Sequence, residues 1–184
     1  MTDKIDNWNR LASLLPEPEA QHVRDAWSIG EQEAGLDMLV GGLLAHQVVI
    51  SERTRAEISV TADVWGEREA LAPRLLQCRG DGRPAAVKLI ERDGVTISAA
   101  AVGVEGELAD LVLVPWIACT RCGQTLMRGH TLEHWGDLSY SAWHHLIVSP
   151  DHSSVVRLFS DESAHVAFGA LLHECPEGER PPSP

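Results

Sequence analysis

Apolar residues recur at helical spacing through the amino-terminal part of the chain. The clearest run follows the i, i+3, i+4, i+7, i+8 rule and consists of Leu36, Leu39, Val40, Leu43 and Leu44. Residues with this spacing lie on one side of an α-helix, so the run predicts a helix over residues 31–45. Shorter stripes predict four more helices, whose inward positions are Trp8, Leu11 and Leu15; Ala20, Val23, Ala26 and Trp27; Ile58, Thr61, Ala62 and Trp65; and Leu71, Leu75 and Leu76.

Residues with special backbone or capping properties separate the predicted helices. Gly30 has the backbone freedom to end one helix before the next begins. Ser51 is placed to accept a hydrogen bond from the free amides of the helix that follows it. Pro16 ends the first helix, because proline cannot continue one. Short helices with such brief connections predict a compact antiparallel bundle over residues 1–79.

The hydrophobic pattern changes from a helical to a strand-like period after a loop predicted at residues 78–84. Residues 87–90 and 95–102 are predicted to pair as a hairpin, with a glycine-containing turn at 92–94. Because the change of period coincides with a loop that contains Gly and Pro, we place a domain boundary there. A second domain, an antiparallel β domain, is predicted over residues 85–175.

Two further strand signals lie in this second domain. Residues 111–118 are almost continuously apolar, which predicts a strand that is buried on both faces. Pro115 has no N–H to donate, so it restricts this strand to a sheet edge or a bulge. Residues 144–148 and 155–159 flank the turn-forming segment 149–154 and are predicted to form a second hairpin.

The chain is predicted to finish with a helix over residues 162–173, capped by Ser160 or Asp161, and a proline-rich, disordered tail at 176–184. The side chains predicted to face inward from this helix are Val166, Ala170 and Leu171. The predicted fold class is therefore α+β: an N-terminal antiparallel helical bundle is followed by a small antiparallel β-sheet with a C-terminal helix.

The 184-residue chain is 44% hydrophobic and 23% charged, as ordinary globular proteins are. It begins without a charged and then apolar leader, and it has no run of about 18 apolar residues. Neither secretion nor membrane insertion is predicted, and a cytoplasmic location follows. The formal net charge of −12 disfavours direct binding to nucleic acid, because phosphate contacts need Lys and Arg.

Negative charge is concentrated between residues 17 and 37, where Arg24 stands alone among Lys and Arg. We expect an acidic surface that binds a basic protein, because complementary charge speeds association and selects partners. The structural alternative is a set of solvated helical faces. The predicted partner-binding residues are Glu17, Glu19, Asp25, Glu31, Glu33 and Asp37. Glu31 also stands where a carboxylate stabilises the start of a helix.

Cys119 and Cys122 form a C-x-x-C-G motif directly after a predicted strand. Such a turn points two thiolates at one place, as a zinc knuckle does, and His130 and His134 follow at a spacing that can complete a tetrahedral shell. We therefore predict a structural Zn²⁺ ion held by these four residues, since a closed shell leaves no position for catalysis. Other possible ligands are His144, His145 and Cys175. The alternative without metal is a pair of reduced thiols.

Motifs of common enzymes are missing from the sequence: it has no Walker loop, dinucleotide fingerprint, H-E-x-x-H or G-x-S-x-G. A redox role for the C-x-x-C pair needs a helix start, whereas strand is predicted after Cys122. The protein is therefore predicted not to be an enzyme. Most of its six tryptophans fall on predicted core positions. Trp135 and Trp143 are the two candidates for exposed binding anchors, although core positions are favoured for them as well.

Residues 20–70 resemble the small helical immunity proteins of the colicin D and Maf toxin systems. These share a Gly-Glu entry, an Ala/Gly-Leu-Asp/Glu-x-Leu helix and an x-Ile-Ser-x-x-Thr third helix. The matching residues are Gly30, Glu31, Gly35, Leu36, Asp37, Leu39, Leu43, Ile50, Ser51, Thr54, Ile58, Ala62 and Gly66.

The resemblance implies an immunity protein, or antitoxin, that binds a cognate toxin domain. In the resembled families the toxin is often a nuclease with a basic groove, which the acidic inhibitor occupies in place of the nucleic acid. The alternative is a zinc-stapled adaptor or regulatory protein that binds its partner through the second domain. A hydrolase that uses the Cys- and His-rich region ranks last.

Overall fold

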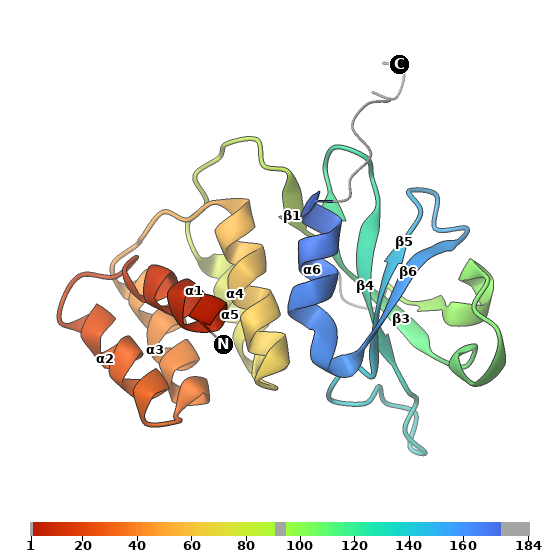
Figure 1. Cartoon of the computed structure of the whole chain (residues 1–184), viewed down its shortest axis with the longest axis horizontal. Coiled ribbons are helices and arrows are strands. Elements are labelled where there is room, and N and C mark those ends of the chain that lie inside the picture. The colour runs from red at the N-terminus through yellow and green to blue at the C-terminus, as the bar shows by residue number, and fades with distance from the viewer. Residues whose placement is uncertain (1, 91–94, 174–184) are drawn as a thin grey trace. The chain divides into compact units, whose positions relative to one another are not determined.

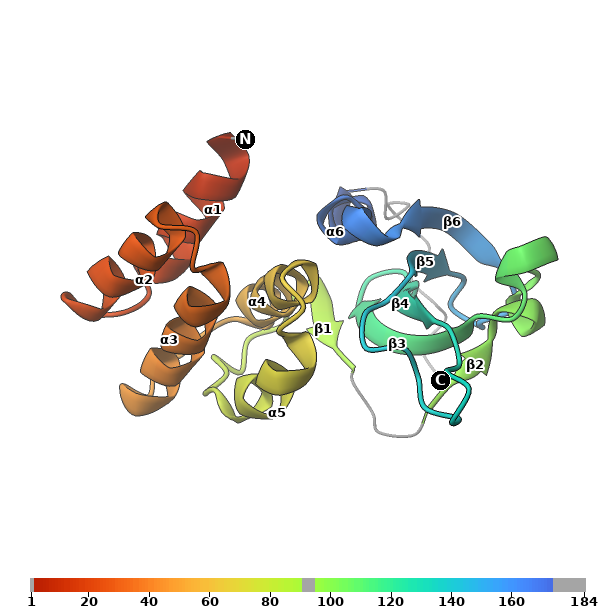
Figure 2. The same ribbon diagram turned by 90° about the horizontal axis from the view of Figure 1, so that it is seen from below.

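The computed structural model describes residues 2–90 and 95–173. Contacts divide the chain into two compact units, Met1–Arg83 and Pro84–Pro184. The division falls within the loop predicted at 78–84. Among the described residues the first unit is helical, and the second combines an antiparallel sheet with one α-helix (Figures 1 and 2). The predicted α+β class is confirmed.

The described part of the first unit contains five helices: α1 (Thr2–Ala12), α2 (Glu19–Ser28), α3 (Gln32–Ala45), α4 (Glu52–Val64) and α5 (Arg68–Gln77). Each corresponds to one of the predicted stripes, and brief connections join them (Figure 1, red to yellow). α2 packs against both α1 and α3, while α5 packs against both α3 and α4. The predicted helical bundle is thus present.

Three of these helices end in the same backbone motif, centred on Gly30, Gln47 and Gly66. Their φ angles are 86°, 50° and 72°. In each case the amide of the following residue donates to the carbonyl five residues earlier, over 2.8 to 2.9 Å, which closes a Schellman motif. Glycine enters this left-handed conformation freely, whereas Gln47 carries a Cβ into it. The predicted cap of α4 is confirmed, because Ser51 Oγ accepts from the Thr54 amide over 3.0 Å.

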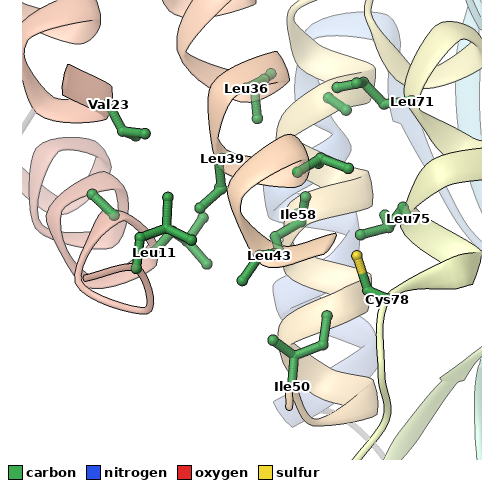
Figure 3. Packing of buried hydrophobic residues seen from close by; sticks show 14 of the residues in the cluster. Leu11, Val23, Leu36, Leu39, Leu43, Ile50, Ile58, Leu71, Leu75 and Cys78 are labelled. Atoms are coloured by element: carbon green, nitrogen blue, oxygen red, sulfur yellow. The ribbon is translucent and has the colours of Figure 1, made fainter. Parts of the chain in front are cut away.

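The inward stripes of the five helices meet in one core, part of which is drawn in Figure 3. Its buried members with large side chains include Leu11, Val23, Leu36, Leu39, Leu43, Ile58, Leu71 and Leu75. The inward prediction for Leu76 is wrong, since this side chain is 51% exposed. Leu71 and Leu75 occupy the inner face of α5, and the next residue points about 100° away from Leu75 around the helix axis.

Trp8 fixes the approach of α1 to its neighbours. Its indole N–H donates to the Val23 carbonyl over 2.9 Å, and its ring centre lies 4.9 Å from that of Trp27. A Cβ placed on Gly35 of α3 would come within 2.6 Å of the Trp8 ring. The missing side chain at Gly35 is therefore what allows α3 and the indole to pack so closely.

The described part of the second unit contains six strands: β1 (Val87–Leu89), β2 (Ile97–Ser98), β3 (Val112–Cys119), β4 (Thr125–His130), β5 (His144–Val148) and β6 (Val155–Ser160). Every pairing is antiparallel, the spatial order is β1-β3-β4-β5-β6, and β2 also pairs with β3. The predicted hairpin of residues 144–148 and 155–159 is confirmed, because β5 and β6 pair directly.

The hairpin predicted between residues 87–90 and 95–102 is wrong. β1 pairs with the end of β3 near Cys119, and β2 pairs with the beginning of β3 near Leu113. The two short strands therefore follow one another along β3 and do not pair with each other. A strand of two or three residues gains more from a long apolar partner than from another short strand. Ala99–Val102 forms a 3-10 turn, and the predicted turn at 92–94 lies outside the described residues.

Pro115 lies in a strand that is interior to the sheet. Its ladder with β4 shifts register between Pro115 and Ile117, so the predicted bulge is observed. On the other side of β3, β1 pairs only with residues that follow Pro115, and β2 pairs only with residues that precede it. The proline therefore stands where its missing N–H costs no ladder hydrogen bond.

A 3-10 turn and the helix α6 both pack against the sheet. Residues of the 3-10 turn, including Ala99 and Val102, pack with Met127 and Leu146 in one hydrophobic cluster. The helix α6 (Ala164–His173) lies against β4, β5 and β6.

The α6 helix begins two residues later than predicted, after a 3-10 turn at Asp161–Ser163. Ala170 and Leu171 are buried as predicted, whereas Val166 is 62% exposed, contrary to its predicted inward position. Ala167 takes the buried position next to it. The tail predicted at 176–184 lies outside the described residues.

Candidate functional site

Three of the six predicted partner-binding carboxylates already have basic neighbours within the first unit. Glu17 accepts a hydrogen bond from Arg24 over 2.8 Å. A Glu19 oxygen lies 3.3 Å from His46 Nε2. The third, Asp37, forms an ion pair with Arg74 that connects α3 to α5. A partner that approached these groups would have to compete with contacts inside the protein.

The other three carboxylates are exposed and differently placed. Asp25 accepts from the neutral Gln21 side chain over 2.7 Å. Within the part of the chain that the structure describes, neither Glu31 nor Glu33 forms an ion pair. Glu31 takes the N-cap position of α3, but its side chain makes no capping hydrogen bond. Its competing structural role at the helix start is therefore not one of side-chain capping.

Between these carboxylates the chain exposes an apolar side chain, Ile29, which is 73% accessible. Its amide donates to the Asp25 carbonyl over 3.1 Å, and Gly30 then turns the chain into α3. We call the group of Asp25, Ile29, Glu31 and Glu33 the α2–α3 corner. The sequence identified its carboxylates but gave no reason to single out Ile29, because the residue falls between two helical stripes.

The C-x-x-C-G motif forms a tight turn between β3 and β4. The Gly123 amide donates to the Cys119 carbonyl over 2.9 Å, and the Cys119 amide donates to the Gln124 carbonyl over 2.8 Å. Gly123 has a φ of 78°. The Cys119 side chain is buried and that of Cys122 is half-buried. The two cysteines therefore stand in the turn that joins β3 to β4.

The structure does not bring the four predicted zinc ligands together. Cys119 stands at the turn, whereas His130 pairs with Val112 at the opposite end of the β3–β4 ladder, about 20 Å away at the usual rise per residue. The His130 Nδ1 lies 2.8 Å from the Ser139 carbonyl. His134 lies further along the chain, edge-on to Trp135 with 4.3 Å between ring centres. The two cysteines and His130 are close in sequence but lie at opposite ends of a strand.

Across the described residues, no group of three His, Cys, Asp or Glu side chains is arranged to hold a metal ion. His144 and His145 lie on β5 and point to opposite faces of the sheet. Cys175 lies outside the described residues.

In the first unit, burial raises the pKa of the Cys78 thiol, while the positive charges of Arg55 and Arg74 lower it.

The tryptophans divide between core and surface. Trp8 and Trp116 are buried, as predicted, and Trp27 and Trp65 pack against the helical core. Trp135 and Trp143 were expected in the core, but they are 62% and 58% exposed. Both lie in the connection between β4 and β5, which the sequence patterns left unassigned. Leu132 and Tyr140 of this connection are also exposed, and helical or strand periodicity gave no signal for them.

No protein-family model, curated protein or solved structure matches this chain.

None of the helices in the described ranges has the length and apolar character needed to cross a bilayer.

Proposed function

We propose that the protein is an immunity protein, a non-enzymatic inhibitor that binds a basic toxin domain through the α2–α3 corner. The observation that carries this proposal is the exposed Ile29 between carboxylates that form no ion pair with any residue the structure describes. An apolar contact surrounded by charges is the usual composition of a protein interface. The resemblance of residues 20–70 to helical immunity proteins supports the same assignment.

The contacts within the first unit separate the six carboxylates into those that would give up an existing ion pair on binding a partner and those that would not. Glu31 and Glu33 can pair with Lys or Arg of a partner without breaking an existing ion pair. Asp37, in contrast, would have to give up Arg74. We therefore assign the main electrostatic contribution to Glu31 and Glu33, with Asp25 beside them. Charges at such positions speed encounter and choose the partner, while the buried apolar contact slows dissociation.

A nuclease is the toxin class that this surface suits best. The active-site cleft of a nuclease must be basic to hold a phosphate backbone. Carboxylates that enter the cleft meet the same Lys and Arg side chains, and they exclude the nucleic acid by occupying its place. Inhibition then requires no catalytic group on this chain.

Co-expression with the products of neighbouring genes tests the proposal. Each neighbour is expressed alone and with the full chain, and growth of the host is measured. We expect one neighbour to be toxic alone and harmless with the wild-type chain. The double variant Glu31→Gln/Glu33→Gln should weaken binding of that toxin by about tenfold or more.

The matched control is Glu105→Gln/Glu107→Gln, which removes the same charge from two exposed residues of the second unit. It should bind like the wild type. The proposal is contradicted if the chain relieves no toxicity, or if both double variants bind a rescued toxin as tightly as the wild type does.

An adaptor that holds its partner through the second unit is the other candidate. The exposed Trp135 and Trp143 favour it, since exposed tryptophan is a frequent interface anchor. Its proposed zinc staple has no assembled four-ligand set among the described residues. An adaptor would bind a partner without suppressing any toxicity, so the growth assay separates it from an inhibitor.

A further inference from the structure

The connection between β4 and β5 is a defined piece of structure. The Ser139 amide donates to the Thr131 carbonyl, and the Glu133 amide donates to the Asp137 carbonyl, each over 2.8 Å. A bridge between Leu132 and Leu138 lies between these two contacts. Residues 131–139 therefore form a small hairpin, which we call the β4–β5 hairpin.

The tip of this hairpin presents Trp135. The Gly136 amide donates to the Glu133 carbonyl over 2.9 Å, and Gly136 has a φ of 95°. Three residues that end with a glycine in the left-handed region are a common way to join two antiparallel strands. The turn leaves Trp135 with no place in the sheet, and its indole extends into solvent.

Buried polar groups hold the base of the hairpin. Ser139 is 7% exposed, and its Oγ accepts from the Thr131 amide over 3.2 Å and donates to the Ser141 carbonyl over 2.9 Å. His130 is 3% exposed, and its Nδ1 lies 2.8 Å from the Ser139 carbonyl, which must accept. Because these groups are buried and satisfied, they fix the direction in which the hairpin leaves the sheet.

The segment 131–143 exposes large apolar side chains on this fixed support. The four that are more than half exposed are Leu132, Trp135, Tyr140 and Trp143. Trp143 donates its backbone amide to the Gly129 carbonyl over 2.8 Å, so its backbone continues the sheet while its indole remains accessible. Exposed aromatic side chains on a rigid support are characteristic of binding sites, because little entropy is lost when a partner covers them.

The charges on the hairpin select the kind of partner. Glu133 and Asp137 stand opposite each other across the two strands, an arrangement in which like charges repel. Within the described residues neither forms an ion pair, and the segment 131–143 contains no Lys or Arg. A cation placed between the two carboxylates would relieve the repulsion.

We propose that the β4–β5 hairpin binds an arginine-bearing segment of a partner protein. A guanidinium group stacks on the face of an indole and at the same time donates hydrogen bonds to a carboxylate, so it suits Trp135 at the tip together with Glu133 and Asp137, which flank the tip. The planar guanidinium is more weakly hydrated than the lysine ammonium and is preferred at such a site. This site belongs to the second unit and does not depend on the α2–α3 corner.

Other ligands of aromatic surfaces fit these charges less well. Anionic lipid head groups and nucleic-acid phosphates would be repelled by Glu133 and Asp137. A neutral oligosaccharide can stack on tryptophan but does not use the paired carboxylates. These ligands serve as competing outcomes of the test.

The test follows the indole N–H signals of the full-length protein by NMR. The probe is a short blocked arginine–glycine peptide, and the matched peptide replaces arginine with citrulline, which has nearly the same shape but no charge. We expect the arginine peptide to shift the signal of Trp135 with millimolar affinity, and the citrulline peptide to shift it far less. Phosphatidylserine-containing vesicles and a neutral β-glucan oligosaccharide complete the comparison.

Substitutions at the hairpin locate the site. Trp135→Ala, followed through the backbone amide signals of Glu133 and Asp137, and the charge variant Glu133→Gln/Asp137→Asn should each weaken binding of the arginine peptide roughly two- to fivefold or more. Val166→Ala removes an equally exposed apolar side chain from α6 and should have no effect. Glu31→Gln/Glu33→Gln should also have none, so failure of this proposal is distinguishable from failure of the proposed function.

Three results would overturn the proposal. One is the absence of any indole shift with the arginine peptide at millimolar concentration. Another is equal binding of the arginine and citrulline peptides. The third is a stronger response to the vesicles or the oligosaccharide than to arginine. The charge variant retains every aromatic side chain, and a backbone spectrum like that of the wild type verifies that each variant is folded.

Discussion

The α2–α3 corner and the β4–β5 hairpin both present apolar side chains beside carboxylates, but their supports differ. The corner is held by main-chain hydrogen bonds at Gly30 and by close packing of Trp8 on Gly35. The hairpin is held by buried side-chain hydrogen bonds of Ser139 and His130. The geometry of the corner therefore depends on close packing of side chains against the backbone. The geometry of the hairpin depends on buried polar groups that must keep their hydrogen-bond partners.

This difference predicts which substitutions disturb each surface. A single added methyl group in the helical core should move the corner and leave the hairpin unchanged. Loss of a single hydroxyl group at the base of the hairpin should move the hairpin and leave the corner unchanged. Because the two surfaces belong to different compact units, both effects can be measured in one protein.

The largest effect is expected from Gly35→Ala. The new Cβ would lie 2.6 Å from the Trp8 ring, and the rigid indole cannot move without losing its hydrogen bond to Val23. We expect the free energy of unfolding of the first unit to fall by about 2 to 3 kcal/mol. Urea denaturation followed by tryptophan fluorescence measures this change.

Gly41→Ala is the matched control in the same helix. Its Cβ would meet only the flexible end of Arg74, at 3.1 Å. Because alanine favours a helix more than glycine does, stability should stay equal or rise by up to about 1 kcal/mol. If the variants at Gly35 and Gly41 were equally stable, the packing of Trp8 would not be what supports the corner.

Ser139→Ala should have the next largest effect. The substitution removes the acceptor of the Thr131 amide and the donor to the Ser141 carbonyl. Leaving such buried groups without partners should cost the second unit about 1 to 2 kcal/mol. Hydrogen exchange at the Thr131 amide should accelerate, while exchange in α2 and α3 should not change. Unaltered exchange at Thr131 would show that Ser139 does not hold the hairpin.

A smaller gain is expected from Gln47→Gly at the end of α3. Gln47 has a φ of 50° in a Schellman motif that uses glycine at the ends of α2 and α4. Glycine removes the strain of a side chain in the left-handed region, so unfolding of the first unit should require about 0.5 to 1 kcal/mol more. Thermal denaturation compares the variant with the wild type, and a lower melting temperature would contradict the explanation.

The smallest effect concerns the turn between β5 and β6, where hydrogen bonds are exposed rather than buried. Hydrogen bonds from Ser149 and Ser153 lower the pKa of Asp151 to about 2 from 3.8. Because the folded state has the lower pKa, the stabilisation of the turn is fully present above about pH 4 and is lost as pH falls through about 2. An NMR titration of the Asp151 carboxyl should find this midpoint in the wild type. A midpoint near 3.8 would show that these hydrogen bonds do not persist in solution.

Helical contacts were predictable because they join residues three or four positions apart. The stripes of α3 and α4 and the cap at Ser51 depend on such short-range relations. The hairpin of β5 and β6 was predictable because the turn-forming segment between its strands is short. The errors at Leu76 and Val166 have another cause. Helical spacing identifies an apolar stripe, but the neighbouring elements decide which side of it is buried.

The sequence by itself determined the two-part α+β organisation, the helix ends and the excess of carboxylates near α2 and α3. The tertiary structure alone decided that β1 and β2 share one edge of β3, that the length of a strand separates Cys119 from His130, and that Ile29 and Trp135 face solvent. The reason is physical. Backbone geometry sets local contacts over a few residues, whereas strand partners, metal-ligand distances and exposure depend on chain segments far apart in sequence that meet only on folding.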